Sequence, residues 1–314
     1  MIIGMIFMSH AFCQQLQIDQ LQALKIKHPL FSATLLLQGA QLIEFTPSDT
    51  ENNLLWLSDT VEYKQGKPLR GGIPICWPWF GNLDQNPDVI QDQVNQHQRS
   101  NKQDVSAVGA HGFARSQCWE IKNIHEDCHF VEVTLILSSN SESKSIWPFE
   151  FELEATFKFS NSVKLTLTTK NTGNSPFSIS QALHTYLPTE DITRSYIHNA
   201  HNTTYIDALD GWKEKKQIGK VSFSEETDRL YFFDNDNYSL RLETPNQSLS
   251  INNENSKNAV IWNPWSEKSK RLSQFDPQDF HHMLCIETAN VLTNIKKINA
   301  GENTQISVEL VLNS

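Results

Sequence analysis

Three consecutive stretches of alternating apolar and polar residues constrain the fold of this chain most strongly. In residues 131–137, 151–159 and 163–168, every second side chain is apolar and most of the side chains between are polar. A period of two places one set of side chains on a buried face of a β-sheet and the other set in water. The short turn at residues 160–162 predicts an antiparallel hairpin. Antiparallel sheets commonly have one wet face, so the predicted class is all-β.

Further short apolar runs extend this pattern along the chain. We expect strands at 35–45 (two pieces that meet at a glycine bend), 53–58, 177–187, 229–233, 239–243, 248–252, 259–262, 283–288 and 305–312. Helical periodicity is weak, and short helical turns are expected only near 274–279. Many short strands with little helix favour a large β-sandwich.

Length and charge bound the class of protein. A chain of 314 residues with 39% apolar residues can bury a large core, and an all-β protein of this size is ordinarily one domain. We expect a single β-sandwich domain over residues 23–314, preceded by an N-terminal extension over residues 1–22. The formal charge of −10 argues against a nucleic-acid or anionic-membrane partner, because both bind basic surfaces.

The N-terminal residues and the cysteines bear on location. Residues 1–8 are apolar but few, and no Lys or Arg precedes them, so they make a poor signal peptide and cannot span a bilayer. Met8 is itself an alternative start of the chain. The five cysteines are odd in number and lack paired spacing, which indicates reduced thiols and a cytoplasmic protein. A membrane or periplasmic location is the alternative.

One dense segment, residues 70–81, combines rigidity with a charge. Its sequence is Arg-Gly-Gly-Ile-Pro-Ile-Cys-Trp-Pro-Trp-Phe-Gly, in which glycines and prolines fix an irregular backbone and the apolar side chains require packing. Arg70 at its head is always charged, and a packed turn would not carry it without an anion or a carboxylate to meet it. The segment therefore predicts an anion-binding wall.

Four later segments mix aromatic, charged and small residues in the same way, at 110–115 (AHGFAR), 182–187 (ALHTYL), 262–265 (WNPW) and 285–287 (CIE). Together with the segment that Arg70 opens, they resemble the aldose 1-epimerase (mutarotase) superfamily, in particular its hexose-6-phosphate branch, the glucose-6-phosphate 1-epimerases. The resemblance runs from about Gly39 to the last predicted strand. It implies a two-sheet, galactose-mutarotase-like β-sandwich. It also implies a monomeric enzyme that interconverts the α and β anomers of glucose 6-phosphate without a cofactor or metal.

Two titratable residues stand on predicted strands. Alternation places His184 on one face with small neighbours, which leaves room for a ligand, although a lone strand histidine is more often structural. Glu287 lies in a strand that is apolar on both sides, so its carboxyl group would be desolvated. A raised pKa suits a general base near neutral pH, and a structural ion pair with a buried arginine is the alternative. The resemblance implies that Glu287 is the catalytic base and His184 the catalytic acid.

Four further residues are candidates for substrate binding. Two guanidinium groups, those of Arg70 and Arg115, could converge on one phosphate through bidentate, charge-assisted hydrogen bonds. His111 either donates to the sugar or braces its turn. Asp228 stands ahead of a predicted strand, where Asp is usually a turn former, and the resemblance implies that it holds a substrate hydroxyl. One position departs from some members of this branch, in which a glutamine precedes His-Gly and contacts the ligand; Ala110 stands there in this chain, so one hydrogen bond to the substrate is expected to be absent.

Other functions remain open at this point. A mutarotase for unphosphorylated aldoses would show no preference for the phosphate ester, and a non-catalytic carbohydrate-binding β-sandwich would bind sugar without anomerising it. A cupin-like metal enzyme would need three or four clustered ligands. His281 and His282 are adjacent, so they point to opposite faces of a strand, and no third ligand has a recognisable spacing.

Two features are ambiguous. The polar run 82–106 is either a lid over a site or a solvated surface insertion. Four tryptophans near the motifs either offer apolar faces to a pyranose ring or belong to the core, namely Trp77, Trp79, Trp262 and Trp265.

Overall fold

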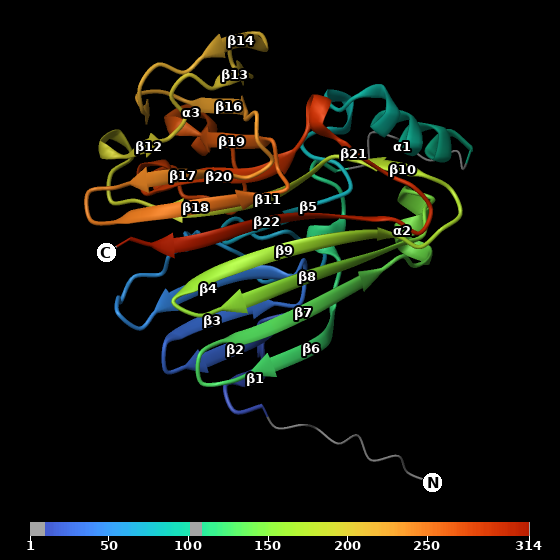
Figure 1. Ribbon diagram of the computed structural model, residues 1–314, viewed down its shortest axis with the longest axis horizontal. Helices are drawn as coiled ribbons and strands as arrows, with labels where there is room; N and C mark the ends of the chain where they lie inside the picture. The colour runs from blue at the N-terminus through green and yellow to red at the C-terminus, as the bar shows by residue number, and fades with distance from the viewer. Residues whose placement is uncertain (1–9, 101–108, 314) are drawn as a thin grey trace.

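A computed structural model of the chain describes residues 10–100 and 109–313 (Figure 1). The largest sheet has nine strands in the order β15 (Val221–Ser222), β12 (Tyr196–His198), β17 (Tyr238–Glu243), β18 (Ser248–Glu254), β22 (Asn303–Leu312), β9 (Ser162–Asn171), β8 (Phe151–Phe159), β7 (Val131–Ser138) and β6 (Glu120–Glu126). A seven-stranded sheet has the order β14 (Lys213–Lys216), β13 (Thr204–Asp207), β16 (Thr227–Phe232), β19 (Asn258–Asn263), β20 (Met283–Asn290), β11 (Gln181–Pro188) and β5 (Ile75–Cys76).

Two smaller sheets complete the fold. Strands β1 (Cys13–Ile18), β2 (Leu21–His28), β3 (Phe31–Leu36) and β4 (Gln41–Pro47) form one, and β10 (Phe177–Ile179) and β21 (Lys296–Ile298) form the other. The helical elements are α1 (Asp88–Ser100), α2 (Ser141–Ile146), α3 (Trp265–Ser269) and the 3₁₀ turns η1 (Leu83–Gln85), η3 (Ala114–Ser116), η4 (Ile192–Arg194), η5 (Asp279–His281) and η6 (Leu292–Asn294). Neighbouring strands pair antiparallel, which confirms the predicted all-β antiparallel class.

The three alternating stretches form β7, β8 and β9 at one end of the largest sheet. The predicted hairpin is present, with Phe157 paired to Leu165 and Phe159 to Val163. The apolar members of each stretch are buried, and the side chains between them are mostly half-buried. The ring of Phe159 packs against Phe31 and Phe45 of the four-stranded sheet, so this sheet covers the inner face of β7–β9.

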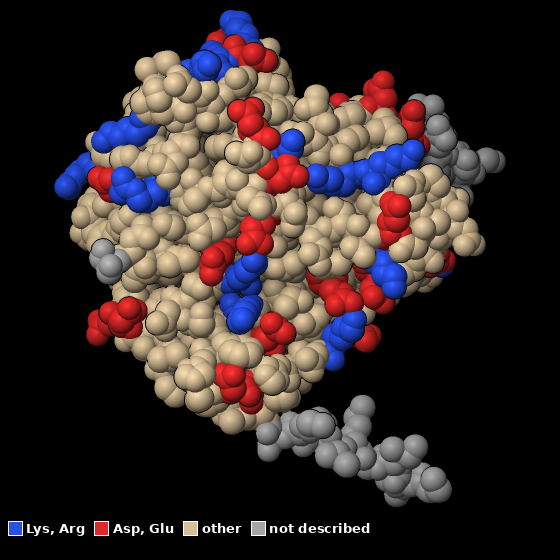
Figure 2. All heavy atoms as spheres, viewed as in Figure 1, with Lys and Arg blue, Asp and Glu red and all other residues tan. Residues whose placement is uncertain are grey.

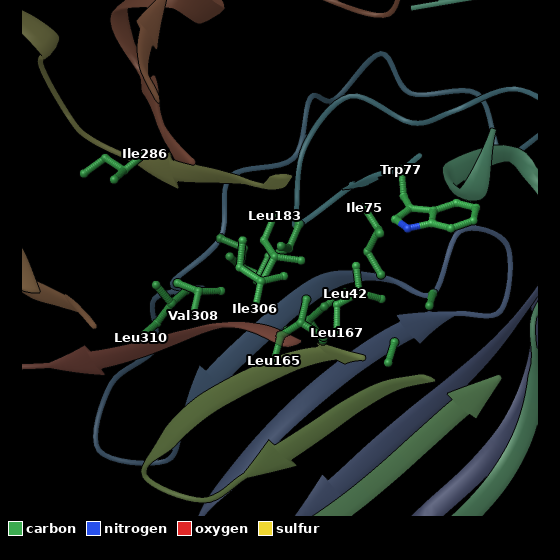
Figure 3. Close-up of a cluster of buried hydrophobic side chains, with 14 of the residues drawn as sticks. Leu42, Ile75, Trp77, Leu165, Leu167, Leu183, Ile286, Ile306, Val308 and Leu310 are labelled. Carbon is green, nitrogen blue, oxygen red and sulfur yellow. The ribbon is translucent and has the colours of Figure 1, made fainter. Parts of the chain in front are cut away.

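The core that supports the site lies between the two large sheets. Figure 3 shows Leu165 and Leu167 of β9 and Val308 of β22 directed toward Leu183 of β11 and Ile75 of β5. All of these side chains are at most 1% exposed. Because side chains alternate along a strand, the other face of β11 and β20 is free to carry polar groups.

The expected strand at residues 53–58 is wrong. The segment makes only an isolated bridge, between Leu57 and Gly71. The Asn53 side-chain oxygen accepts hydrogen bonds from the backbone N–H groups of Phe45 and Leu55, and such local bonds compete with a regular ladder.

The polar run 82–106 contains a helix, so the prediction of a loop is wrong for Asp88–Ser100. Ile90 and Val94 are spaced by four residues and are at most 1% exposed, and this short apolar stripe packs α1 onto the protein. Residues 101–106 lie outside the described part of the chain. The helical turn expected near 274–279 is instead η5, with α3 ahead of it.

The N-terminal segment contributes a strand. Residues 13–18 of the expected extension form β1 and pair with β2 from Cys13–Ile26 to Ile18–Leu21. The remarks on a signal peptide and on Met8 concern residues 1–9, which lie outside the described residues. No helix among the described residues is long and apolar enough to cross a membrane.

On the face in view in Figure 2, acidic and basic side chains are interspersed.

Candidate active site

The two candidate proton-transfer groups lie opposite each other on neighbouring strands. β11 pairs antiparallel with β20, and the register sets His184 directly across from Glu287. The His184 Nε2 atom is 3.4 Å from the Glu287 Oε1 atom. His184 is 8% exposed and Glu287 is 2% exposed. The contact is therefore set by the backbone ladder, and both groups are largely withdrawn from bulk water.

All six residues expected at the site from the sequence line one cavity of about 580 Å³, namely Arg70, His111, Arg115, His184, Asp228 and Glu287. Its floor is the face of the seven-stranded sheet that points away from the core between the two large sheets. The volume is within the range of ordinary small-molecule sites.

The orientation of His184 is fixed by its neighbours. Its imidazole stacks on the phenol of Tyr186 at a centroid distance of 4.7 Å and an interplanar angle of 8°. The His111 ring meets it edge-on at 5.7 Å. His184 Nδ1 and Glu287 Oε2 are buried without a hydrogen-bond partner among the described residues. Buried polar atoms are rarely left unpaired, so these two atoms are available to a ligand.

Burial pushes the two groups toward their neutral forms. Desolvation, reinforced by the charges of Arg115 and Arg70, lowers the pKa of His184 to about 3. Desolvation, together with the nearby Asp228 carboxyl group, raises the pKa of Glu287 well above its ordinary value. Both shifts favour the uncharged forms of the pair, an imidazole that can accept a proton beside a carboxyl group that can give one.

Arg70 and Arg115 line the cavity; Arg70 precedes β5 in the chain, and Arg115 lies in η3, which packs beside β5. Arg70 donates from Nε to the backbone carbonyl of Ser273, and its guanidinium lies 5.9 Å from the ring centroid of Phe275. Arg115 donates to the backbone carbonyl of Ala110. Among the described residues, neither arginine forms an ion pair with a carboxylate. The two guanidinium groups thus bring positive charge to the cavity of an acidic protein, and each keeps further N–H groups that can donate to a ligand.

Close backbone contact joins the segments of the two arginines. A Cβ on Gly112 would lie 2.0 Å from the carbonyl oxygen of Trp77, so only glycine fits there. The backbone N–H of His111 donates to Gly81 at 2.8 Å, and the His111 Nδ1 accepts from the Gly81 N–H at 3.3 Å. His111 thus braces this turn and also lines the cavity.

Asp228 occupies the opposite part of the floor, on β16. Desolvation raises the pKa of Asp228 to about 6, and the positive charge of Lys268 opposes this rise. The Lys268 Nζ lies 4.0 Å from Asp228 and 3.2 Å from Glu226. The Asp228 carboxylate therefore becomes an anionic hydrogen-bond acceptor only above about pH 6.

Sequence reasoning missed several lining residues. They include Asn82, Gln85, Leu209, Trp212, Lys268 and Leu272. Asn82 directly follows the segment 70–81, and Lys268 stands three residues after Trp265, so closeness to a quoted motif was the one available signal.

The four tryptophans near the motifs have different places. Trp77 and Trp79 are at most 1% exposed and pack in the core, so they offer no face to a sugar. Trp262 lines the cavity. Trp265 packs against Phe280. Among the described residues, no group of three or more His, Cys, Asp or Glu side chains is placed to hold a metal ion.

Comparison with known proteins decides the family. The family model described as "Aldose 1-epimerase" matches residues 22–310. The chain belongs to the aldose 1-epimerase family. It is 30% identical over 274 residues to an Escherichia coli protein named "Putative glucose-6-phosphate 1-epimerase", which covers 87% of this chain and 84% of that protein. A protein of the same name from Cenchrus ciliaris is 30% identical over 273 residues, and this alignment covers 82% of this chain and 75% of that protein.

A solved structure extends the likeness to three dimensions. The crystal structure of a protein of Salmonella typhimurium, titled a "putative mutarotase", superposes with a TM-score of 0.84 at 26% identity. The match covers 97% of this chain and 95% of that one. This aldose 1-epimerase family member therefore shares the mutarotase-like fold over nearly its whole length.

Proposed function

We propose that this protein interconverts the α and β anomers of glucose 6-phosphate. The observation that carries the proposal is the buried His184–Glu287 pair, 3.4 Å apart in a cavity that also holds Arg70 and Arg115 without carboxylate partners among the described residues. Relatives named as glucose-6-phosphate 1-epimerases support the same substrate. The chain's five free cysteines support a cytoplasmic location.

The reaction needs an acid and a base at one carbon atom. The anomeric hydroxyl oxygen and the ring oxygen are both bonded to C1, so two groups in contact with each other can reach both. Transfer of the shared proton from the Glu287 Oε1 to the His184 Nε2 turns the resting pair into a carboxylate and an imidazolium. This transfer changes no net charge, and a bound sugar replaces the missing solvent as a partner for both groups.

Ring opening then uses each group once. The Glu287 carboxylate takes the proton of the anomeric hydroxyl while the His184 imidazolium protonates the ring oxygen. The bond between C1 and the ring oxygen breaks as the C1 carbonyl forms. Rotation about the C1–C2 bond presents the other carbonyl face. Closure reverses both proton transfers and restores the carboxylate and the imidazolium, and return of the proton from His184 to Glu287 then gives the resting pair.

The remaining side chains would orient the ring. The phosphate is attached through C6 on the ring-oxygen side of the sugar, and Arg70 and Arg115 lie on the His184 side of the floor. Two guanidinium forks would bind it with charge-assisted hydrogen bonds. Asp228 lies two strands from Glu287 and would accept from a ring hydroxyl.

The test of the activity is exchange NMR on glucose 6-phosphate. We expect catalytic amounts of protein to accelerate exchange between the α and β anomers above the spontaneous rate, and to act less efficiently on glucose. Equal efficiency on glucose would favour a mutarotase for unphosphorylated aldoses. Saturable binding without faster exchange would contradict an enzymatic function and favour a carbohydrate-binding module.

The pKa of Asp228 gives a separate prediction. Because the pKa of Asp228 is raised to about 6, its carboxyl group is neutral below this pH and accepts only a weaker hydrogen bond. We expect KM for glucose 6-phosphate to rise roughly 10-fold between pH 7 and pH 5 in the wild type. Asp228→Asn should have the higher KM at both pH values, and its KM should lack the rise that protonation of Asp228 causes in the wild type. The phosphate also titrates near pH 6, so the two proteins are compared on the same substrate. If KM changed with pH in the same way in the wild type and in Asp228→Asn, the role of Asp228 as a hydrogen-bond acceptor would be contradicted.

A further inference from the structure

A strained turn carries a tryptophan at the rim of the cavity. β13 and β14 form a hairpin whose loop closes with a hydrogen bond from the Lys213 N–H to the Asp210 carbonyl at 3.3 Å. The two residues between them, Gly211 and Trp212, have φ angles of 61° and 59°. Positive φ at both central positions is the signature of a type I′ turn, where Gly and Asn are preferred.

Trp212 is an unusual residue for such a position. A bulky side chain in the left-handed region crowds the backbone, and strain of this kind concentrates at functional sites. Core packing does not explain the residue, because it is 43% exposed. Leu209 in the same loop is 48% exposed, and both side chains line the cavity. Four large apolar residues are this exposed among the described residues, and these two adjoin the cavity.

The loop is held in place by charged neighbours. Lys215 bridges Asp207 at 2.8 Å and Asp210 at 2.9 Å, and Lys213 also bridges Asp210 at 2.8 Å. The Asp207 carboxylate accepts from the Leu209 backbone N–H as well. Single surface ion pairs contribute little, but here three of them share members and fix one short turn. These ion pairs and this hydrogen bond thus fix the turn that carries the indole of Trp212.

Trp212 and the two arginines line the cavity from opposite ends of the seven-stranded sheet. The loop begins at Ala208, whose N–H donates to the backbone carbonyl of Asp228 at 3.0 Å. The strand order runs from β13 through β16, β19 and β20 to β11, which spans about 19 Å at ordinary strand spacing. Figure 1 shows the β13–β14 hairpin projecting at one end of this sheet. A sugar whose phosphate lies at the arginine end would turn its ring toward Trp212.

We propose that Trp212 is a sugar-binding residue whose indole stacks on the apolar C–H face of the bound pyranose ring. This rests on the proposed function and extends it, because it assigns recognition of the ring to a residue that takes no part in proton transfer. Aromatic faces bind such apolar surfaces with little loss of conformational entropy, since Trp has two rotatable side-chain bonds. Leu209 extends the same apolar rim.

The test is the dissociation constant of glucose 6-phosphate, measured by calorimetry for the wild type, Trp212→Gly and Trp212→Phe. We expect Trp212→Gly to bind about 3- to 10-fold more weakly with kcat little changed. Its melting temperature should be equal or higher, because glycine suits a positive φ. Trp212→Phe keeps a ring and should bind within about 2-fold of the wild type. Ile218→Ala, at an apolar position that is 74% exposed and outside the cavity, is the matched control.

Inorganic phosphate separates the possible outcomes. Its affinity should be the same in Trp212→Gly and in the wild type, since the indole contacts the ring and not the phosphate. If the wild type anomerises glucose 6-phosphate and Trp212→Gly binds it equally well, the stacking role is overturned and the proposed function stands. If the wild type does not bind glucose 6-phosphate, both proposals are overturned.

Discussion

Glu287→Gln and His184→Asn are each expected to lower the catalysed rate of anomerisation by about 100-fold or more. Either change leaves the pair unable to give one proton and take another, while the new side chain still fills most of the original volume. The effect should fall on kcat, because neither group is expected to bind the phosphate. The measurement is α/β exchange of glucose 6-phosphate by NMR, with the spontaneous rate subtracted.

The chain offers a matched control for this pair. His198 and Glu243 form a second His–Glu contact at 2.8 Å, outside the cavity and more exposed. His198→Asn and Glu243→Gln should leave the rate unchanged. Wild-type rates in both site variants, with melting temperatures that show folded protein, would remove the acid–base assignment.

The shared proton also sets the direction of the pH dependence. Because the pKa of His184 is lowered to about 3 and the pKa of Glu287 is raised, the pair holds one proton across the intervening pH range. The catalytic form has the same number of protons, so kcat should fall as pH rises through the raised pKa of Glu287, and on the acid side only near the His184 pKa of about 3. A kcat that keeps increasing into the alkaline range would contradict a shared proton.

Arg70→Gln and Arg115→Gln are expected to weaken productive binding of glucose 6-phosphate by about 10- to 100-fold each. Each change removes charge-assisted hydrogen bonds to a phosphate dianion in a protein of net charge −10. The effect on kcat/KM for glucose should be much smaller, because glucose lacks the phosphate. The measurement is the ratio of kcat/KM for the two sugars in each variant.

Arg241→Gln is the control for the arginine variants. Arg241 forms an ion pair with Glu243 and does not line the cavity. This variant tests whether the loss of any one positive charge weakens anion binding through the electrostatic field of the whole protein. An equal loss for glucose and glucose 6-phosphate in the two cavity variants would refute the phosphate role.

The strands that carry the site were predictable, but their adjacency was not. Alternation indicates which face of a strand a side chain occupies, and it set His184 on the side away from the core. It does not identify neighbours, and His184 and Glu287 are about a hundred residues apart in the chain. The resemblance to mutarotases brought the six residues together as candidates, and in the structure they line one cavity. Their roles remain predictions.

Other features were hidden for local physical reasons. Among the side chains of α1 that the structure describes, the buried ones are Ile90 and Val94, and a pair in a polar sequence is too short an apolar stripe to stand out. The Asp210-Gly211 dipeptide is a turn signal, but nothing in the sequence places Trp212 at the rim of a cavity. Such a placement depends on strand order, which arises from contacts between distant parts of the chain.

The proton-transfer pair and the phosphate-binding candidates are supported in different ways. His184 and Glu287 are opposed across a hydrogen-bonded ladder, whereas Arg70 and Arg115 come from irregular connecting segments. Connecting segments tolerate substitution, while a register shift of one residue would turn either strand's side chains to the wrong face. Relatives with this sheet could therefore evolve toward new sugars by exchanging the connections alone, and the chemistry at C1 would be inherited unchanged.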